Sequence, residues 1–212
     1  MSDVFELFPT PVMRVEKLLS REQVAALKKG LVPAASTQNH RSQALTHSAM
    51  LSSADRPELA QLHTLLAPHL QAFGKLLFGE LLTWHIKEMW VNVMETGGRQ
   101  AVHNHANCFA CGILYLSDAH PSSWTLFTRS LGGRDFVFAN TNARAETGAF
   151  NADKWRSPQP EPGDLLLFPS YLLHEVPPNE GPRRITLAFN AIPERLDAWG
   201  YQLEFKAPGA SS

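Results

Sequence analysis

The chain is poor in cysteine and carries no signal for export. It has two cysteines among 212 residues, too few for a disulfide framework. Asp3 and Glu6 lie where a secretory signal would need a basic flank and a long apolar run. We therefore expect a reducing, cytoplasmic setting for this protein.

The chain also lacks a charge excess and a membrane-length apolar run. Its formal net charge is −1, whereas proteins that bind nucleic acid usually carry a basic surface. No stretch reaches the roughly 18 consecutive apolar residues that suggest a membrane span. We therefore expect neither a nucleic acid nor a membrane as a partner. The expected partner is a small-molecule or peptide substrate whose identity the sequence does not show.

The apolar content is sufficient for one buried core, since 44% of the residues are hydrophobic and 18% are charged. We expect a single domain over 1–212, with a helical support region over 1–80 and a strand-rich core over 81–192.

Ser20 and Gln23 have the spacing of a capping box before a first helix. A second helix begins near Asp55 and Glu58, and Pro68 is expected to kink or divide it. The polar stretch 33–53 between these helices has no periodicity and is predicted to be a long loop, a plausible lid.

Short apolar runs separated by turns dominate the remainder of the chain. The turns include Gly97-Gly98, which is expected to end the first strand, and Gly132-Gly133. This spacing is typical of an antiparallel sandwich or barrel. The fold class we predict is therefore mainly β with flanking N-terminal helices. The strands are expected at Trp84–Met94, Phe109–Leu116, Trp124–Thr128, Phe136–Ala139, Asp164–Phe168, Leu172–Val176 and Arg184–Ile192.

Two histidines, His103 and His105, are separated by one residue in a predicted strand. Residues two apart in a strand project from the same face, so one cation can bind both imidazoles. The change of pattern at Ala106 places the pair near a strand end, where a site is open to substrate. A pair of surface histidines would show the same spacing, so the motif alone is weak.

A third histidine, His174, stands in the apolar strand that follows Pro169. A buried imidazole needs partners for both of its ring nitrogens. A metal on one nitrogen and a carbonyl on the other would meet this need. A hydrogen-bonded core histidine without a metal would meet it equally well.

The last predicted strand alternates Arg184, Thr186, Ala188 and Asn190 on one face with apolar residues on the other. Arg184 then points into a polar interior, and a buried guanidinium needs an anion such as a carboxylate. A structural Asp or Glu is the competing partner. The neighbouring Arg183 projects oppositely and is expected in solvent.

The order of these residues, two close histidines, a distant histidine and an arginine ten positions later, resembles the Fe(II)/2-oxoglutarate-dependent oxygenases. Within them the chain resembles a bacterial and phage group of 2-oxoglutarate/iron oxygenases. The resemblance covers about half the chain, and the first third matches only in Phe8–Pro11. The matching segments are Trp90–Asn92, His103–Asn107, Gly112–Leu116, Gly163–Pro169 with Ser170 and His174, and Arg184–Asn190.

The resemblance implies a double-stranded β-helix, a cupin-like jelly roll with a metal near one mouth. It implies an oxidoreductase that couples oxidation of an unknown substrate to conversion of 2-oxoglutarate into succinate and CO2, with Fe(II) as the metal. Homodimers are common among such proteins, and one is expected here. The implied metal ligands are His103, His105 and His174, and the implied 2-oxoglutarate contacts are Arg184, Tyr115, Asn92 and Asn190.

The chain departs from the family pattern at His105, because the usual ligand set is two histidines and one carboxylate. Three neutral imidazoles leave the +2 charge of iron uncompensated by protein, and zinc also accepts such ligands. Two alternatives therefore stay open. One is a three-histidine dioxygenase of the cupin type that works without 2-oxoglutarate, with Arg184 on the substrate's own carboxylate. The other is a jelly-roll module that binds a metal without catalysis.

The two cysteines, Cys108 and Cys111, have the spacing of a C-x-x-C pair. Such a pair can be redox-active or bind zinc. In a strand, positions three apart face opposite sides, which disfavours both uses. We therefore interpret them as space-filling thiols.

Overall fold

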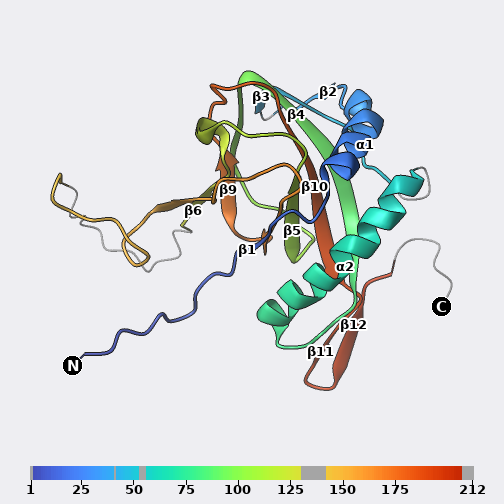
Figure 1. Cartoon of the computed structure of the whole chain (residues 1–212). Helices are drawn as coiled ribbons and strands as arrows, with labels where there is room; N and C mark the ends of the chain where they lie inside the picture. The colour runs from blue at the N-terminus through green and yellow to red at the C-terminus, as the bar shows by residue number, and fades with distance from the viewer. Residues whose placement is uncertain (1, 41, 53–55, 130–141, 207–212) are drawn as a thin grey trace.

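The computed structural model describes residues 2–40, 42–52, 56–129 and 142–206, and it is mainly β with two helices near the N-terminus (Figure 1). This confirms the predicted fold class. No helix in the part of the chain that is described is long and apolar enough to cross a membrane. The elements are β1 Met13–Val15, α1 Arg21–Leu31, η1 Val32–Ala34, β2 Thr37–Gln38, β3 Ser42–His47, α2 Pro57–Phe78, β4 Trp84–His103, β5 Ala110–Tyr115, η2 Pro121–Ser123, β6 Leu126–Thr128, β7 Lys154–Arg156, β8 Leu165–Pro169, β9 Leu173–Val176, β10 Arg184–Pro193, β11 Arg195–Ala198 and β12 Tyr201–Glu204.

The strands pair antiparallel in one curled sheet with the order β1-β8-β5-β10-β4-β9-β6-β7. Strand β4 belongs to both halves of this sheet. Its first part, Trp84 to Met94, pairs with β10, and its last part pairs with β9 through Gln100 and His103. The sheet therefore folds back on itself along β4, and the inner faces of its two halves look toward each other.

The two helices cover the outer face of the sheet, as predicted (Figure 1). The capping box at the start of α1 is present: Ser20 Oγ accepts from the Gln23 N–H at 3.3 Å, and Gln23 Oε1 accepts from the Ser20 N–H at 2.9 Å. Apolar side chains at helical spacing on α1 and α2 share one core with the outward residues of β4, β8 and β10. Burial of these side chains from water is the main force that holds the helices in place. They are Val24, Leu27, Leu31, Leu59, Leu62, Leu66, Leu70 and Phe73.

Several expectations for the first 80 residues need correction. Pro68 does not divide the second helix, because α2 runs as one element through it, with the Pro68 side chain on the exposed face. The stretch 33–53, expected to be a loop, contains the hairpin β2–β3, and β3 extends the sheet beside β4. Only Leu45 of β3 is buried. Because little of this strand is covered by the core, its sequence shows little of the apolar alternation by which a strand is predicted. The region 1–80 thus contributes three strands as well as the helical support.

Strand β4 does not end at Gly97-Gly98 but bends there and continues to His103. Gly97 has a φ of +79°, which glycine adopts without a steric penalty. The backbone of Asn179 holds the bend: its carbonyl accepts from the Gly97 N–H at 2.7 Å, and its N–H donates to the Gly98 carbonyl at 2.8 Å. The Gly97-Gly98 pair therefore marks a bend inside a strand and not the end of that strand.

The strand expected at Phe136–Ala139 lies outside the described residues, and the hairpin β11–β12 was not predicted.

A nearly buried carboxylate, Asp164, ties β1 to the start of β8. Arg14 donates to Asp164 Oδ2 from Nη2 at 2.6 Å and from Nε at 3.1 Å. The backbone N–H groups of Lys17 and Glu161 donate to its two oxygens at 2.9 and 3.0 Å. Burial alone would raise the pKa of Asp164, but the bonds from Glu161, Lys17 and Arg14 outweigh burial and lower it.

We expect Asp164→Asn to reduce the free energy of unfolding by about 2–3 kcal/mol at neutral pH, because bonds to a charged group are lost. A carboxyl whose pKa is lowered by folding stabilises the fold above its ordinary pKa, and this stabilisation is lost as the pH falls through the folded value. The variant should therefore lose less stability than the unaltered chain below about pH 4. Urea unfolding from pH 3 to 7 measures both effects. Glu16→Gln is the control, since Glu16 also contacts Arg14 but is 68% exposed, and we expect at most about 0.5 kcal/mol there.

Candidate metal centre

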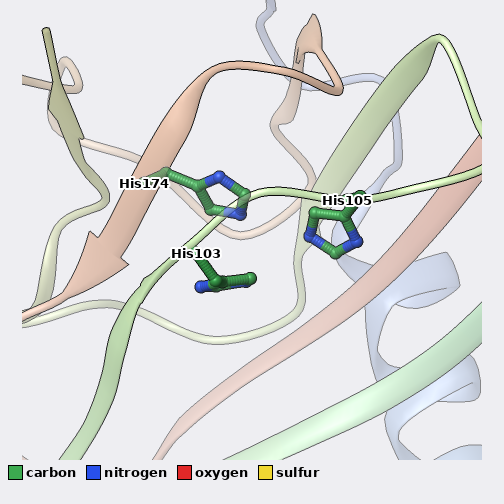
Figure 2. A group of neighbouring side chains, drawn as sticks. All are labelled: His103, His105 and His174. Carbon is green, nitrogen blue, oxygen red and sulfur yellow. The ribbon is translucent and has the colours of Figure 1, made fainter. Parts of the chain in front are cut away.

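Three histidines from two strands and one loop lie together on the inner side of the sheet (Figure 2). His103 is the last residue of β4 and pairs directly with His174 on β9. His105 follows two residues later, outside the strand, and its backbone N–H donates to the Ser170 carbonyl at 3.0 Å. One ring nitrogen from each histidine lies within 4.8 Å of the corresponding nitrogens of the other two. A single metal ion could therefore take one ligand from each of the three.

Two of the rings have their tautomer set by backbone carbonyls. His103 Nδ1 lies 2.8 Å from the Ala101 carbonyl, and His174 Nδ1 lies 2.9 Å from the Leu172 carbonyl. A carbonyl can only accept, so Nδ1 carries the proton in both rings and Nε2 keeps its lone pair. Histidine ligands in metal sites are commonly oriented in this way. The amide nitrogen of Gln100 lies 3.3 Å from His103 Nε2, and nothing in the sequence marked this residue.

The surroundings favour neutral imidazoles. Burial, with a smaller contribution from His103, lowers the pKa of His174 to about 3. The same two causes lower the pKa of His105 to about 4, although Glu88 opposes them. Metals bind the unprotonated ring, so both side chains are in the metal-binding form at neutral pH.

Arg184 lies on the wall of the same cavity and is 3% exposed. Its guanidinium lies over the Tyr115 ring, 5.3 Å from the ring centre, and Nη2 is 3.5 Å from Thr125 Oγ1. Its Nε is buried without a hydrogen-bond partner, and among the described residues no carboxylate forms an ion pair with it. Burial lowers the pKa of Arg184. Within the described residues, no structural Asp or Glu pairs with Arg184, and this buried cation fits the carboxylate of a ligand.

Of the other three expected 2-oxoglutarate contacts, only one lines the cavity. Asn92 lines the cavity, is 8% exposed, and its Oδ1 has no partner. Tyr115 and Asn190 are not among the residues that line it. The Tyr115 hydroxyl instead bonds Thr125 Oγ1 at 2.9 Å, behind Arg184. Thr125 was missed because its partners lie far away in the sequence.

The two thiols do not face opposite sides, contrary to expectation. Strand β5 begins at Ala110, so Cys108 precedes it, and both side chains lie in one buried cluster. The proximity of Cys108 and burial raise the pKa of Cys111, which therefore stays protonated. Both are free cysteines. Cys111 also lines the cavity.

A much larger hollow, of about 1080 Å³, lies between α2, the start of β4 and the hairpin β11–β12. It contains His63 and His85 but is remote from the three converging histidines. The described residues hold no second cluster of metal-ligating side chains. Size therefore does not identify the functional site, whereas the convergence of ligand atoms does.

Comparison with known proteins finds one similar family. Residues 88–190 match the family described as "Putative 2OG-Fe(II) oxygenase". The chain is also 31% identical over 108 residues to a methylphosphonate hydroxylase of Gimesia maris, a match that spans 46% of this chain and 42% of the length of that relative.

Solved structures share the architecture at low sequence identity. HygX of Streptomyces hygroscopicus, with nickel and 2-oxoglutarate bound, superimposes with a TM-score of 0.63 at 15% identity over 87% of this chain and 83% of HygX. The epimerase SnoN of nogalamycin biosynthesis gives 0.64 at 12% identity over 96% and 87%. A prolyl-4-hydroxylase of Pseudomonas putida gives 0.59 at 15% identity over 85% and 92%. These likenesses confirm the predicted jelly roll.

The description of the matching family agrees with the predicted enzyme class and with the two predicted cofactors, Fe(II) and 2-oxoglutarate. The matched segment begins at Glu88 and ends at Asn190, and it includes all three histidines and Arg184. Over residues 88–190, the chain is therefore similar to the 2OG-Fe(II) oxygenase family.

Proposed function

We propose that the chain holds Fe(II) on His103, His105 and His174, holds the far carboxylate of 2-oxoglutarate on Arg184, and oxidises a small organic substrate. One observation carries this proposal: a buried guanidinium that no carboxylate of residues 2–40, 42–52, 56–129 or 142–206 pairs with shares a cavity with three converging, neutral imidazoles. When bound, Fe(II) and 2-oxoglutarate would together activate O2: one oxygen atom would go to succinate as 2-oxoglutarate loses CO2, and the other would be available to oxidise the substrate.

The contribution of the protein is to bind, orient and exclude water. The Ala101 and Leu172 carbonyls fix the rings of His103 and His174 with Nε2 available. Tyr115 and Thr125 form the hydrogen-bonded support behind Arg184. The apolar side chains of Phe168 and Val176 also line the cavity and limit the access of water to it. These contacts form a site that is organised before its ligands arrive.

The three-histidine set favours a second candidate, a dioxygenase that works without 2-oxoglutarate. In that case the Arg184 guanidinium would bind the carboxylate of the substrate itself. The absence of a carboxylate among the three converging side chains supports this candidate, whereas the family match supports the first. A metal-binding module without catalysis is the third alternative.

The substrate, location and assembly are also part of the proposal. We propose a small molecule as substrate, supported by the methylphosphonate hydroxylase relative and by the lack of a basic excess. Two free, buried cysteines support a cytoplasmic location. The homodimer expected from the family stays a prediction.

Anaerobic addition of Fe(II) and then 2-oxoglutarate to the purified chain separates the three candidates. We expect one equivalent of iron to bind and a visible charge-transfer band to form when 2-oxoglutarate chelates it. Iron binding without a band would support the dioxygenase that lacks 2-oxoglutarate. Failure to bind stoichiometric iron would support the module without catalysis and contradict the proposal.

A further inference from the structure

A carboxylate on β4 shares a strand face with a residue that stacks on one of the three histidines. The carboxylate is that of Glu88, two residues before Trp90, so the two side chains share a face of that strand. The Trp90 ring stacks on the His105 ring, with 5.9 Å between ring centres and 29° between planes. Glu88 is therefore next along the strand face to the ring that stacks on the one histidine that takes the place of the family's usual acidic ligand.

A buried amide holds this carboxylate in place. Asn190 on β10 pairs with Glu88 on β4 and with Cys111 on β5, so the three side chains form a row across three strands. Asn190 is 4% exposed, and its Nδ2 donates to Glu88 Oε2 at 2.7 Å. The thiol of Cys111 donates to Asn190 Oδ1 at 3.4 Å. Because the thiol occupies the amide oxygen, the amide nitrogen is left to face the carboxylate.

The amide keeps Glu88 ionised. The bond from Asn190 lowers the pKa of Glu88, against the opposing effect of burial. Lys87 contacts the other oxygen, Oε1, at 3.3 Å, but the Lys87 side chain is 36% exposed, and such surface pairs are weak. Glu88 thus carries a negative charge two residues along β4 from Trp90, which lines the cavity.

The charge of Glu88 acts in the direction that a bound cation requires. The carboxylate lies on the same strand face as Trp90, whose ring stacks on His105. A negative charge at that position attracts positive charge at the three histidines. A divalent metal on three neutral imidazoles would feel the same attraction, and the three ligands themselves provide no compensating charge.

We infer that Glu88, oriented by Asn190, is a positioning residue that compensates the charge of a metal held by His103, His105 and His174. The inference rests on the proposed function, because it requires those histidines to be the ligands. Glu88 replaces, from outside the ligand set, the negative charge that a carboxylate ligand provides in other members of the family. If Glu88 instead bound a cationic substrate, replacing it would leave the affinity of the chain for the metal unchanged.

Metal affinity of the full chain tests this inference directly. Co(II) is the probe, because its visible spectrum reports coordination and its binding can be titrated without turnover. We expect Glu88→Gln, which keeps the shape and removes the charge, to weaken Co(II) binding about tenfold, the lower end of the range for residues that support metal ligands. Glu88→Asp should recover most of the affinity. Glu95→Gln is the matched control: it removes the same charge from the same strand, at an exposed residue paired with Arg183.

The outcomes separate this inference from the proposed function. A tenfold loss in Glu88→Gln, with an unchanged melting temperature of the metal-free chain and no loss in Glu95→Gln, supports the inference. Co(II) affinity equal to that of the unaltered chain overturns it and leaves the proposed function standing. Equal loss of affinity in the Gln and Asp variants with a lower metal-free melting temperature also overturns it, since Glu88 would then be a structural brace. Failure of the unaltered chain to bind Co(II) overturns both.

Discussion

Replacing Arg184 with methionine is expected to weaken the binding of 2-oxoglutarate by about 100-fold and to leave iron binding intact. Removing one partner of a buried charge pair costs about 2–5 kcal/mol, and each 1.4 kcal/mol is a factor of ten in affinity. Arg184 is 3% exposed, and no ion pair to it is present in the described ranges, so the ligand carboxylate would be its counter-charge. Titration of 2-oxoglutarate into the anaerobic iron-loaded chain measures the change.

The same variant should be more stable than the unaltered chain when no ligand is present. A buried cation without an anion opposes folding, and Arg184 Nε is also left without a hydrogen bond. Methionine fills a similar space without charge. We therefore expect a higher melting temperature for ligand-free Arg184→Met. Added iron and 2-oxoglutarate should raise the melting temperature of the unaltered chain more than that of the variant.

Arg183→Met is the matched control for both measurements. Arg183 is the preceding residue, but its side chain is 54% exposed and pairs with Glu95 at 2.7 Å. We expect little change in 2-oxoglutarate binding or stability there. If Arg184→Met binds 2-oxoglutarate as tightly as the unaltered chain, Arg184 is not the carboxylate contact.

Replacing His174 with glutamine is expected to reduce the formation of succinate from 2-oxoglutarate by about 1000-fold or more. A catalytic metal contributes several kcal/mol to a reaction, and each 1.36 kcal/mol is tenfold in rate. His174 is 5% exposed and packs against both other rings, with ring centres 4.2 Å from His103 and 5.2 Å from His105. Iron content and succinate production, measured on the same preparation, check the prediction.

The control for this substitution is His85→Gln, an exposed histidine on the same strand as His103. It should keep both iron and activity. A melting temperature for each variant separates loss of the metal from loss of the fold. A His174→Gln chain that keeps its iron and its activity would contradict the assignment of this residue as a ligand.

The sequence contained enough information to select the three histidines, but not to explain how they meet. The expectation for His103 and His105 assumed one strand through both, whereas β4 ends at His103. His105 is directed inward by its backbone bond to Ser170. The pairing of His103 with His174 depends on an irregular register between Gln100 and His103. Such a register is a property of the assembled sheet and has no local sequence signal.

The supporting residues were beyond prediction because their partners lie far away in the chain. Thr125 meets Arg184 across 59 positions, and Glu88 meets Asn190 across 102. The sequence around each of these residues is that of an ordinary strand. Only the assembled sheet brings the partners into contact. Strand β3 was missed for a different reason: it is an edge strand with a largely polar sequence, and its pairing with β4 is provided by backbone hydrogen bonds.

The central claim is that three imidazoles converge on one metal ion. Anomalous diffraction from a crystal of the chain loaded with Co(II) or Ni(II) tests it most directly. We expect a single strong peak about 2.1 Å from one ring nitrogen of each of His103, His105 and His174. A metal bound elsewhere, or bound without the His174 ring, would contradict the account.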